Sequence, residues 1–151
     1  PDLQDTNGGT ALMGAADQGQ EACVQALLRA KANPDLQANN GGTALMGAAD
    51  QGHEACVQAL LRAKANTELH DNNGITALMA ATCAGQQACV QALLRAKANT
   101  ELHDNNGITA LMGAADHGHE ACVKVLLRAK ANTELHDNDG ITALMGAADH
   151  G

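Results

Sequence analysis

Residues 100–132 read TELHDNNGITALMGAADHGHEACVKVLLRAKAN, and this 33-residue pattern recurs along the whole chain. Five threonines, each opening the tetrapeptide Thr-Ala-Leu-Met, mark the period: Thr10, Thr43, Thr76, Thr109 and Thr142. A fixed period of this length predicts a stack of similar supersecondary units. We expect a single solenoid over 1–151, with units 1–33, 34–66, 67–99 and 100–132 and a partial unit 133–151.

The units are nearly identical to one another. The first two differ only at Asp5/Ala38, Thr6/Asn39 and Gln20/His53, so 30 of 33 positions agree. The third and fourth differ at eight positions, all of which lie between residues 80 and 92 in the third unit. This uneven clustering favours recent tandem duplication.

Composition also argues against one large core. The chain contains no Phe, Trp or Tyr, although 45% of its residues are hydrophobic, and aromatic side chains bury the most area each. Its net charge of −8 disfavours nucleic acid as a partner, because phosphate binding requires clustered Lys and Arg. No apolar run approaches the roughly 20 residues that span a membrane, and the first residues, PDLQD, do not resemble a signal peptide.

The first half of a unit predicts a turn followed by a short helix. Asn and Gly in the stretch 71–74 tolerate the positive φ angles of a tight hairpin tip. The hydroxyl of Thr76 can cap a helix that continues through the strong helix formers of 77–81. Gly85 then ends that helix.

A second helix is expected from about Gln87 to Lys97. Its apolar stripe consists of Cys89, Val90, Leu93 and Leu94. Two such short helices cannot bury their own apolar faces, so neighbouring units must stack.

This pattern resembles the ankyrin repeat. In the fourth unit the matching residues are Asp104, Gly107, Thr109, Leu111, Ala114, Ala115, Gly118, His119, Val123, Leu126 and Leu127. The resemblance covers the whole chain and implies an all-α repeat solenoid. Two departures are regular: Ala-Leu-Met replaces the family's Pro-Leu-His, and a lysine replaces the Gly after the second helix. These lysines are Lys31, Lys64, Lys97 and Lys130.

The histidine and cysteine columns do not predict a metal or cofactor site. Equivalent positions such as His70, His103 and His136 should lie roughly 8–10 Å apart. Ligands of one metal must converge to about 2 Å from it, and a disulfide needs Cα atoms within about 7 Å. We therefore expect the periodic cysteines to pack in the core.

Other candidate sites are weaker still. Cys83 replaces a periodic aspartate and has no partner thiol. The resemblance implies that His53 and His119 brace turns, with His117 and His150 facing outward. The tip 137–140 resembles part of a calcium loop, but Leu135 and Gly146 would occupy its essential ligand positions. No catalytic constellation is visible, so we expect no enzyme.

The resemblance implies protein binding through the hairpin tips and the exposed face of each first helix, where Met13, Asp17, Gln18 and their counterparts should lie. The expected partner-binding residues are Asp17, Asp50, Asp71, Asn72, Cys83, Ala84, Asp104, Asn105, Asp116, His117, Asp137 and Asp149. This concave face should be acidic and should favour a basic protein partner. A solvated face without any partner is the alternative.

The ends of the stack suggest a second mode of interaction. Solenoids need terminal units with polar outer faces, whereas the first unit should expose Leu12, Cys23 and Leu27 and the last should expose Leu144 and Met145. Apolar ends predict stacking of copies, and head-to-tail contacts that do not close form filaments.

Two functional interpretations follow. The first is a structural module that stacks end to end, as part of a long array or as the subunit of a filament. The alternative is a scaffold that binds a basic protein through the acidic concave face. The unpaired cysteines favour the cytoplasm, although an extracellular location stays open.

Overall fold

The computed structural model describes residues 1–149, and these residues form nine α-helices joined by turns and hairpin loops. The first helices of successive units are α1 (Ala11–Asp17), α3 (Ala44–Asp50), α5 (Ala77–Cys83), α7 (Ala110–Asp116) and α9 (Ala143–Asp149). The second helices are α2 (Glu21–Arg29), α4 (Glu54–Arg62), α6 (Gln87–Arg95) and α8 (Glu120–Arg128).

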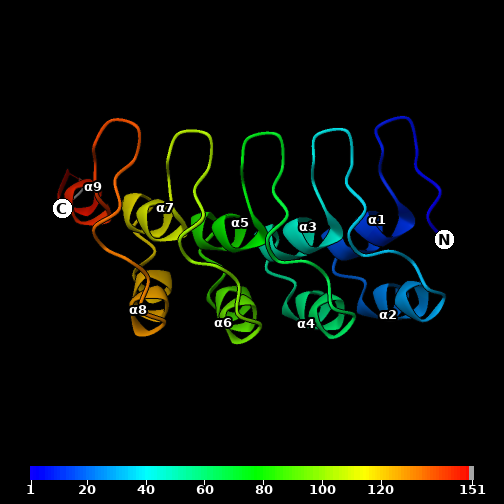
Figure 1. Cartoon of the computed structure of the whole chain (residues 1–151). Coiled ribbons are helices and arrows are strands. Elements are labelled where there is room, and N and C mark those ends of the chain that lie inside the picture. The colour runs from blue at the N-terminus through cyan, green and yellow to red at the C-terminus, as the bar shows by residue number, and fades with distance from the viewer. Residues whose placement is uncertain (150–151) are drawn as a thin grey trace.

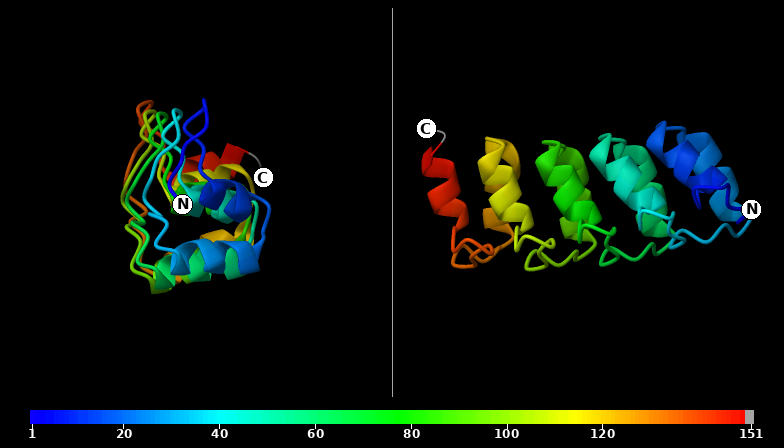
Figure 2. Two further views of the ribbon diagram at one scale, coloured as in Figure 1. Left: turned by 90° about the vertical axis from the view of Figure 1, so that its right-hand side faces the viewer. Right: turned by 90° about the horizontal axis from the view of Figure 1, so that it is seen from above.

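The helices form two parallel rows, with the hairpin loops projecting on one side (Figure 1). Each first helix packs against the first helix of the next unit, and each second helix against the next second helix, while the two helices of a unit also contact each other. Viewed along the stack, the loops superimpose on one another above the helices (Figure 2). The predicted all-α repeat solenoid is confirmed.

The threonine that opens each first helix caps it, as the sequence predicted. Thr76 has an extended backbone, and its hydroxyl accepts a hydrogen bond from the Met79 amide at 3.3 Å. Thr10, Thr43 and Thr109 make the same bond in their own units. The first helix of a unit therefore starts at the same place in every repeat.

The second helix is two residues shorter than predicted. It ends at Arg95 because Lys97 has a φ of +66°, in the left-handed region that a right-handed helix cannot contain. The equivalent Lys31, Lys64 and Lys130 have φ values of +67°, +64° and +62°. Since glycine favours this region, lysine here imposes strain at four positions.

The core runs continuously along the stack. Its largest fully buried side chains come from both helix rows: Leu12, Leu45, Leu78, Leu60, Leu93, Leu126, Val24, Val57, Val90, Thr82, Cys56 and Cys89. Cys122 is buried too, so the prediction that periodic cysteines pack in the core is confirmed for three of the four; Cys23 is exposed.

Polar side chains also connect neighbouring units. Nε2 of His119 donates to the Cys83 carbonyl oxygen at 2.9 Å, and Nε2 of His53 to that of Asp17 at 3.1 Å. Gln86 makes the equivalent bond to Asp50 at 3.2 Å, so an amide replaces the imidazole in the third unit. The bracing role expected for His53 and His119 is confirmed.

Candidate interaction surfaces

A groove of about 490 Å³ lies between the hairpins and the first helices of the first three units. Three carboxylates line it: Asp17 at the end of α1, Asp50 at the end of α3, and Asp71 from the hairpin of the third unit. Met13, Met46 and Ile75 add apolar surface. None of the described residues that line this acidic groove is a lysine or an arginine.

Asp17 and Asp50 occupy the last position of their helices, where the helix dipole is negative. A carboxylate there costs about 0.3–1 kcal/mol at an exposed site. Both side chains are exposed, so they retain access to a partner.

Cys83 takes the corresponding position in the third unit, where it is partly buried. Burial raises the pKa of its thiol, and the negative charges of Asp104, Asp116 and Asp50 raise that pKa further. The thiol is thus protonated at neutral pH. Cys83 interrupts the row of carboxylates with a neutral group, next to the exposed Ala84.

The acidic residues of the hairpin tips hold the turns together. One carboxylate oxygen of Asp71 accepts hydrogen bonds from the amides of Asn73 and Ile75 at 2.8 and 2.9 Å. Asp104 and Asp137 make the same pair of bonds in their own hairpins. Their predicted role in partner binding stays a prediction, since each also stabilises its own turn.

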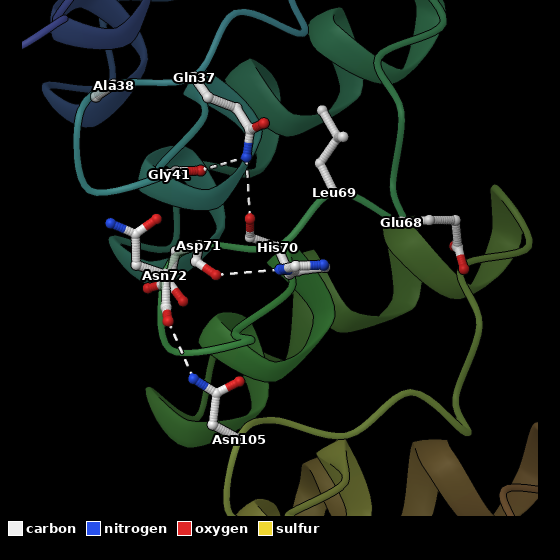
Figure 3. A pocket seen from close by; sticks show the side chains of 9 residues that line it. All are labelled: Gln37, Ala38, Gly41, Glu68, Leu69, His70, Asp71, Asn72 and Asn105. Carbon is white, nitrogen blue, oxygen red and sulfur yellow. Dashed lines mark hydrogen bonds between the residues drawn. The ribbon is translucent and has the colours of Figure 1, made fainter.

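The tip asparagines form a ladder along the stack. Nδ2 of Asn72 donates to the Asn39 carbonyl oxygen at 3.1 Å, and Nδ2 of Asn105 to that of Asn72 at 3.0 Å. Figure 3 shows this second bond beside a polar hollow of about 490 Å³, where Nε2 of Gln37 also donates to the Gly41 and His70 carbonyl oxygens. The amides of Asn72 and Asn105 are therefore engaged in joining units.

The methionines of the first helices are more buried than the sequence predicted. Met13 is half-buried, but Met46, Met79 and Met112 are buried, so the expectation that these counterparts lie on the exposed face is wrong. Each inner methionine is covered because its helix has a neighbouring first helix on both sides. Of these three, Met46 still reaches the acidic groove.

Ile75 was missed as a groove residue. Its position is Gly9 and Gly42 in the first two units and isoleucine in the next three. Comparing the units at this position could have shown that the side chain available to the groove changes from glycine to isoleucine along the stack.

The outward-facing histidine is placed as expected. His117 is exposed, and its Nδ1 donates to the Gly113 carbonyl oxygen at 2.8 Å. Its ring stacks against that of His119 with a centroid separation of 6.0 Å. The Asp149 side chain and His150 lie outside the described residues.

The outer face of the first unit is less apolar than predicted. Leu12 is only 1% exposed, so its assignment to this face is wrong. The second helix of its own unit and the following unit cover it, and no preceding unit is needed. Cys23 is exposed and Leu27 half-buried, and together with Ala11 and Ala26 they line a shallow hollow of about 610 Å³.

The last unit exposes a larger apolar surface. Leu144 is 80% exposed and Met145 is 55% exposed, as the sequence predicted. Leu127 and Ile141 are also exposed in this part of the stack.

Within residues 1–149 no three His, Cys, Asp or Glu side chains converge in a way that could hold a metal ion. The helices in this part of the chain are too short and too polar to cross a bilayer.

The family model for ankyrin repeats, which spans three copies of the repeat, matches residues 12–104, 48–136 and 93–151. A search of curated proteins finds no match.

Proposed function

The chain belongs to the ankyrin repeat family, a family of protein-interaction modules, and on that premise we propose that its acidic groove binds a basic segment of another protein. The role is one of binding and not of catalysis. The observation that carries the proposal is the set of three carboxylates, Asp17, Asp50 and Asp71, above apolar surface in one groove.

The distribution of charge supports this partner chemistry. All nine Lys and Arg residues lie on the second helices or within two residues of their ends, away from the groove. A groove lined by one sign of charge attracts the opposite sign and raises the rate of association. Lysine and arginine also have long aliphatic stems, which the methionines of the groove can contact.

The repeat predicts the spacing of the partner's charges. Asp17 and Asp50 are equivalent residues of adjacent helices, which lie roughly 8–10 Å apart. A peptide in the polyproline II conformation advances about 3.1 Å per residue and has three residues per turn, so every third side chain lies on the same face, about 9 Å from the last. Cationic side chains at every third residue of such a segment therefore match successive carboxylates.

The test is a fluorescence anisotropy titration with a labelled peptide that carries lysine at every third residue. The double variant Asp17→Asn/Asp50→Asn should bind about tenfold more weakly, because exposed ion pairs each contribute up to about 1 kcal/mol. Glu21→Gln/Glu54→Gln, at the starts of α2 and α4 and away from the groove, is the charge-matched control and should bind like the wild-type chain. Equal loss in both double variants would mean that net charge alone attracts the peptide.

A second function, end-to-end stacking, is favoured by a different observation. Cys23 and Ala26 are exposed in the first unit, whereas the equivalent Cys56 and Ala59 are buried by the neighbouring unit. The same side chains thus already form an interface elsewhere in the molecule. Such stacking would suit a long array or a filament subunit.

Light scattering across a concentration series tests this second function, with refractive-index detection because the chain lacks aromatic residues. Growth in mass that Leu27→Glu abolishes would support stacking. A constant mass of 15.4 kDa at all concentrations would contradict self-stacking of this chain.

The free cysteines support a proposed cytoplasmic location, since reducing compartments keep thiols unpaired.

A further inference from the structure

The second helix of every full unit ends at an exposed arginine, and these residues form a basic row: Arg29, Arg62, Arg95 and Arg128. Two residues after each arginine comes one of the exposed lysines with a positive φ angle. The loop that follows contributes one carboxylate per unit, such as Asp35 or Glu68. Each second-helix end therefore retains an excess of one positive charge.

The charges of the basic row are not neutralised within the chain. Nη2 of Arg62 donates to the amide oxygen of Gln58 at 3.3 Å, and Arg29 makes the equivalent bond in its own helix. None of the four arginines forms an ion pair with another described residue, whereas Lys124 and Glu120 do form one. The guanidinium groups of the basic row are therefore available to the carboxylates of a partner.

The basic row and the acidic groove lie on different sides of the solenoid. The groove is lined by residues of the hairpins and the first helices. The basic row belongs to the second helices, which form the row of helices farther from the hairpin tips (Figure 1). One copy can therefore present its basic row to another copy while its own groove stays open to a third.

The two surfaces also share one period. Asp17 and Asp50 end the first helices α1 and α3, and Arg62 and Arg95 end the second helices α4 and α6. Each pair is one unit apart, and adjacent helices in either row lie roughly 8–10 Å from each other. Two arginines of one copy can thus meet two carboxylates of another copy at the same time.

We propose that the basic partner of the acidic groove is a second copy of this chain, which binds side by side with its basic row against Asp17 and Asp50. This inference rests on the proposed function and specifies its partner. Arginine suits the contact, because its guanidinium can donate two parallel hydrogen bonds to one carboxylate. Its aliphatic stem can contact Met13 and Met46 in the groove.

This contact differs from end-to-end stacking in the surfaces that it uses. It joins unlike surfaces of two copies, so it does not close on itself and further copies can add. The net charge of −8 on each copy opposes the approach. At physiological ionic strength, however, exposed charges more than about 8 Å apart are largely screened, whereas charges in direct contact are screened less.

Sedimentation equilibrium over a concentration series tests the inference, with interference detection because the chain lacks aromatic residues. We expect reversible self-association at about 0.1 M salt that weakens at about 1 M salt, where the screening length falls to about 3 Å. Arg62→Glu/Arg95→Glu should weaken this self-association about tenfold, because it replaces two attractive contacts with repulsive ones. Both side chains are exposed, so the fold should stay intact, which circular dichroism verifies.

The matched control exchanges the charges of the two surfaces within one chain. The fourfold variant Asp17→Lys/Asp50→Lys/Arg62→Glu/Arg95→Glu retains the net charge of −8. Since its groove is basic and its row is acidic, it should self-associate like the wild-type chain. The two double variants, Asp17→Lys/Asp50→Lys and Arg62→Glu/Arg95→Glu, should each stay monomeric alone and form a heterodimer when mixed.

A wild-type chain that stays monomeric, or self-association that Arg62→Glu/Arg95→Glu leaves unchanged, would overturn the inference. If the lysine peptide still binds in a manner that depends on Asp17 and Asp50, the proposed function stands and only the identity of the partner is rejected. Failure of the lysine peptide to bind would reject the proposed function as well.

Discussion

The first and second units have almost the same sequence but different environments. Cys23 is exposed and Leu27 half-buried, whereas Cys56 and Leu60 are buried in the second unit. Turn and cap geometry is the same in both, because it depends on contacts within a unit: Thr10 and Thr43 accept the same helix-capping bond. In this protein local sequence determines backbone conformation, and the presence of a neighbour determines burial.

The largest difference between the two units should appear on truncating their equivalent leucines. Leu60→Ala should cost about 2–5 kcal/mol of unfolding free energy, because it leaves a cavity in the core. Leu27→Ala should cost less than about half of that, because the side chain is already partly in solvent. Urea denaturation followed by far-ultraviolet circular dichroism measures both, and equal costs would contradict the comparison.

The buried cysteines should make stability sensitive to alkaline pH. Burial and the charge of Glu54 raise the pKa of Cys89 from its ordinary value near 9 to about 11. Its contribution is fully present below pH 9 and is lost as the pH rises to 11, because only the unfolded thiol ionises in this window. The loss is on the order of 2 kcal/mol.

Urea midpoints measured at pH 8, 9, 10 and 11 test this effect. Cys89→Ala lowers stability at pH 8 but should reduce the slope between pH 9 and 11. A slope that this substitution leaves unchanged would show that other groups cause the alkaline loss.

The smallest changes in stability should come from replacing the lysines that follow the second helices, and these changes should be equal in the two units. Lys31→Gly and Lys64→Gly should each stabilise the chain by roughly 0.5–1 kcal/mol, because both lysines have positive φ angles. Arg62→Gly, within the last turn of α4, should instead destabilise by about 1 kcal/mol. Thermal unfolding of the three variants distinguishes the two signs, and a loss of stability in Lys64→Gly would refute the strain argument.

The sequence predicted the features that repeat within each unit. The threonine caps, the turn-bracing His53 and His119 and the unusual lysine positions all followed from local pattern or from family resemblance. The predictions that were wrong concern burial by neighbouring helices and units. Leu12 and Met46 were placed on exposed faces because identical units do not reveal which face of a helix the adjacent unit covers.

The groove was predicted only in part. Asp17, Asp50 and Asp71 were named as partner-binding residues, and the structure brings these three together. Asp104 and Asp137 belong to other hairpins and do not line this groove. Sequence reasoning distinguished the third unit by residues such as Cys83 and Ala84 but not by Ile75, and the change from Gly42 to Ile75 also alters the lining of this groove.

Charge reversal in the acidic groove tests the central claim most directly. The double variant Asp17→Lys/Asp50→Lys should bind a labelled peptide with glutamate at every third residue and should no longer bind the lysine peptide, as measured by anisotropy at low salt. An unchanged preference for the lysine peptide would contradict binding through this groove.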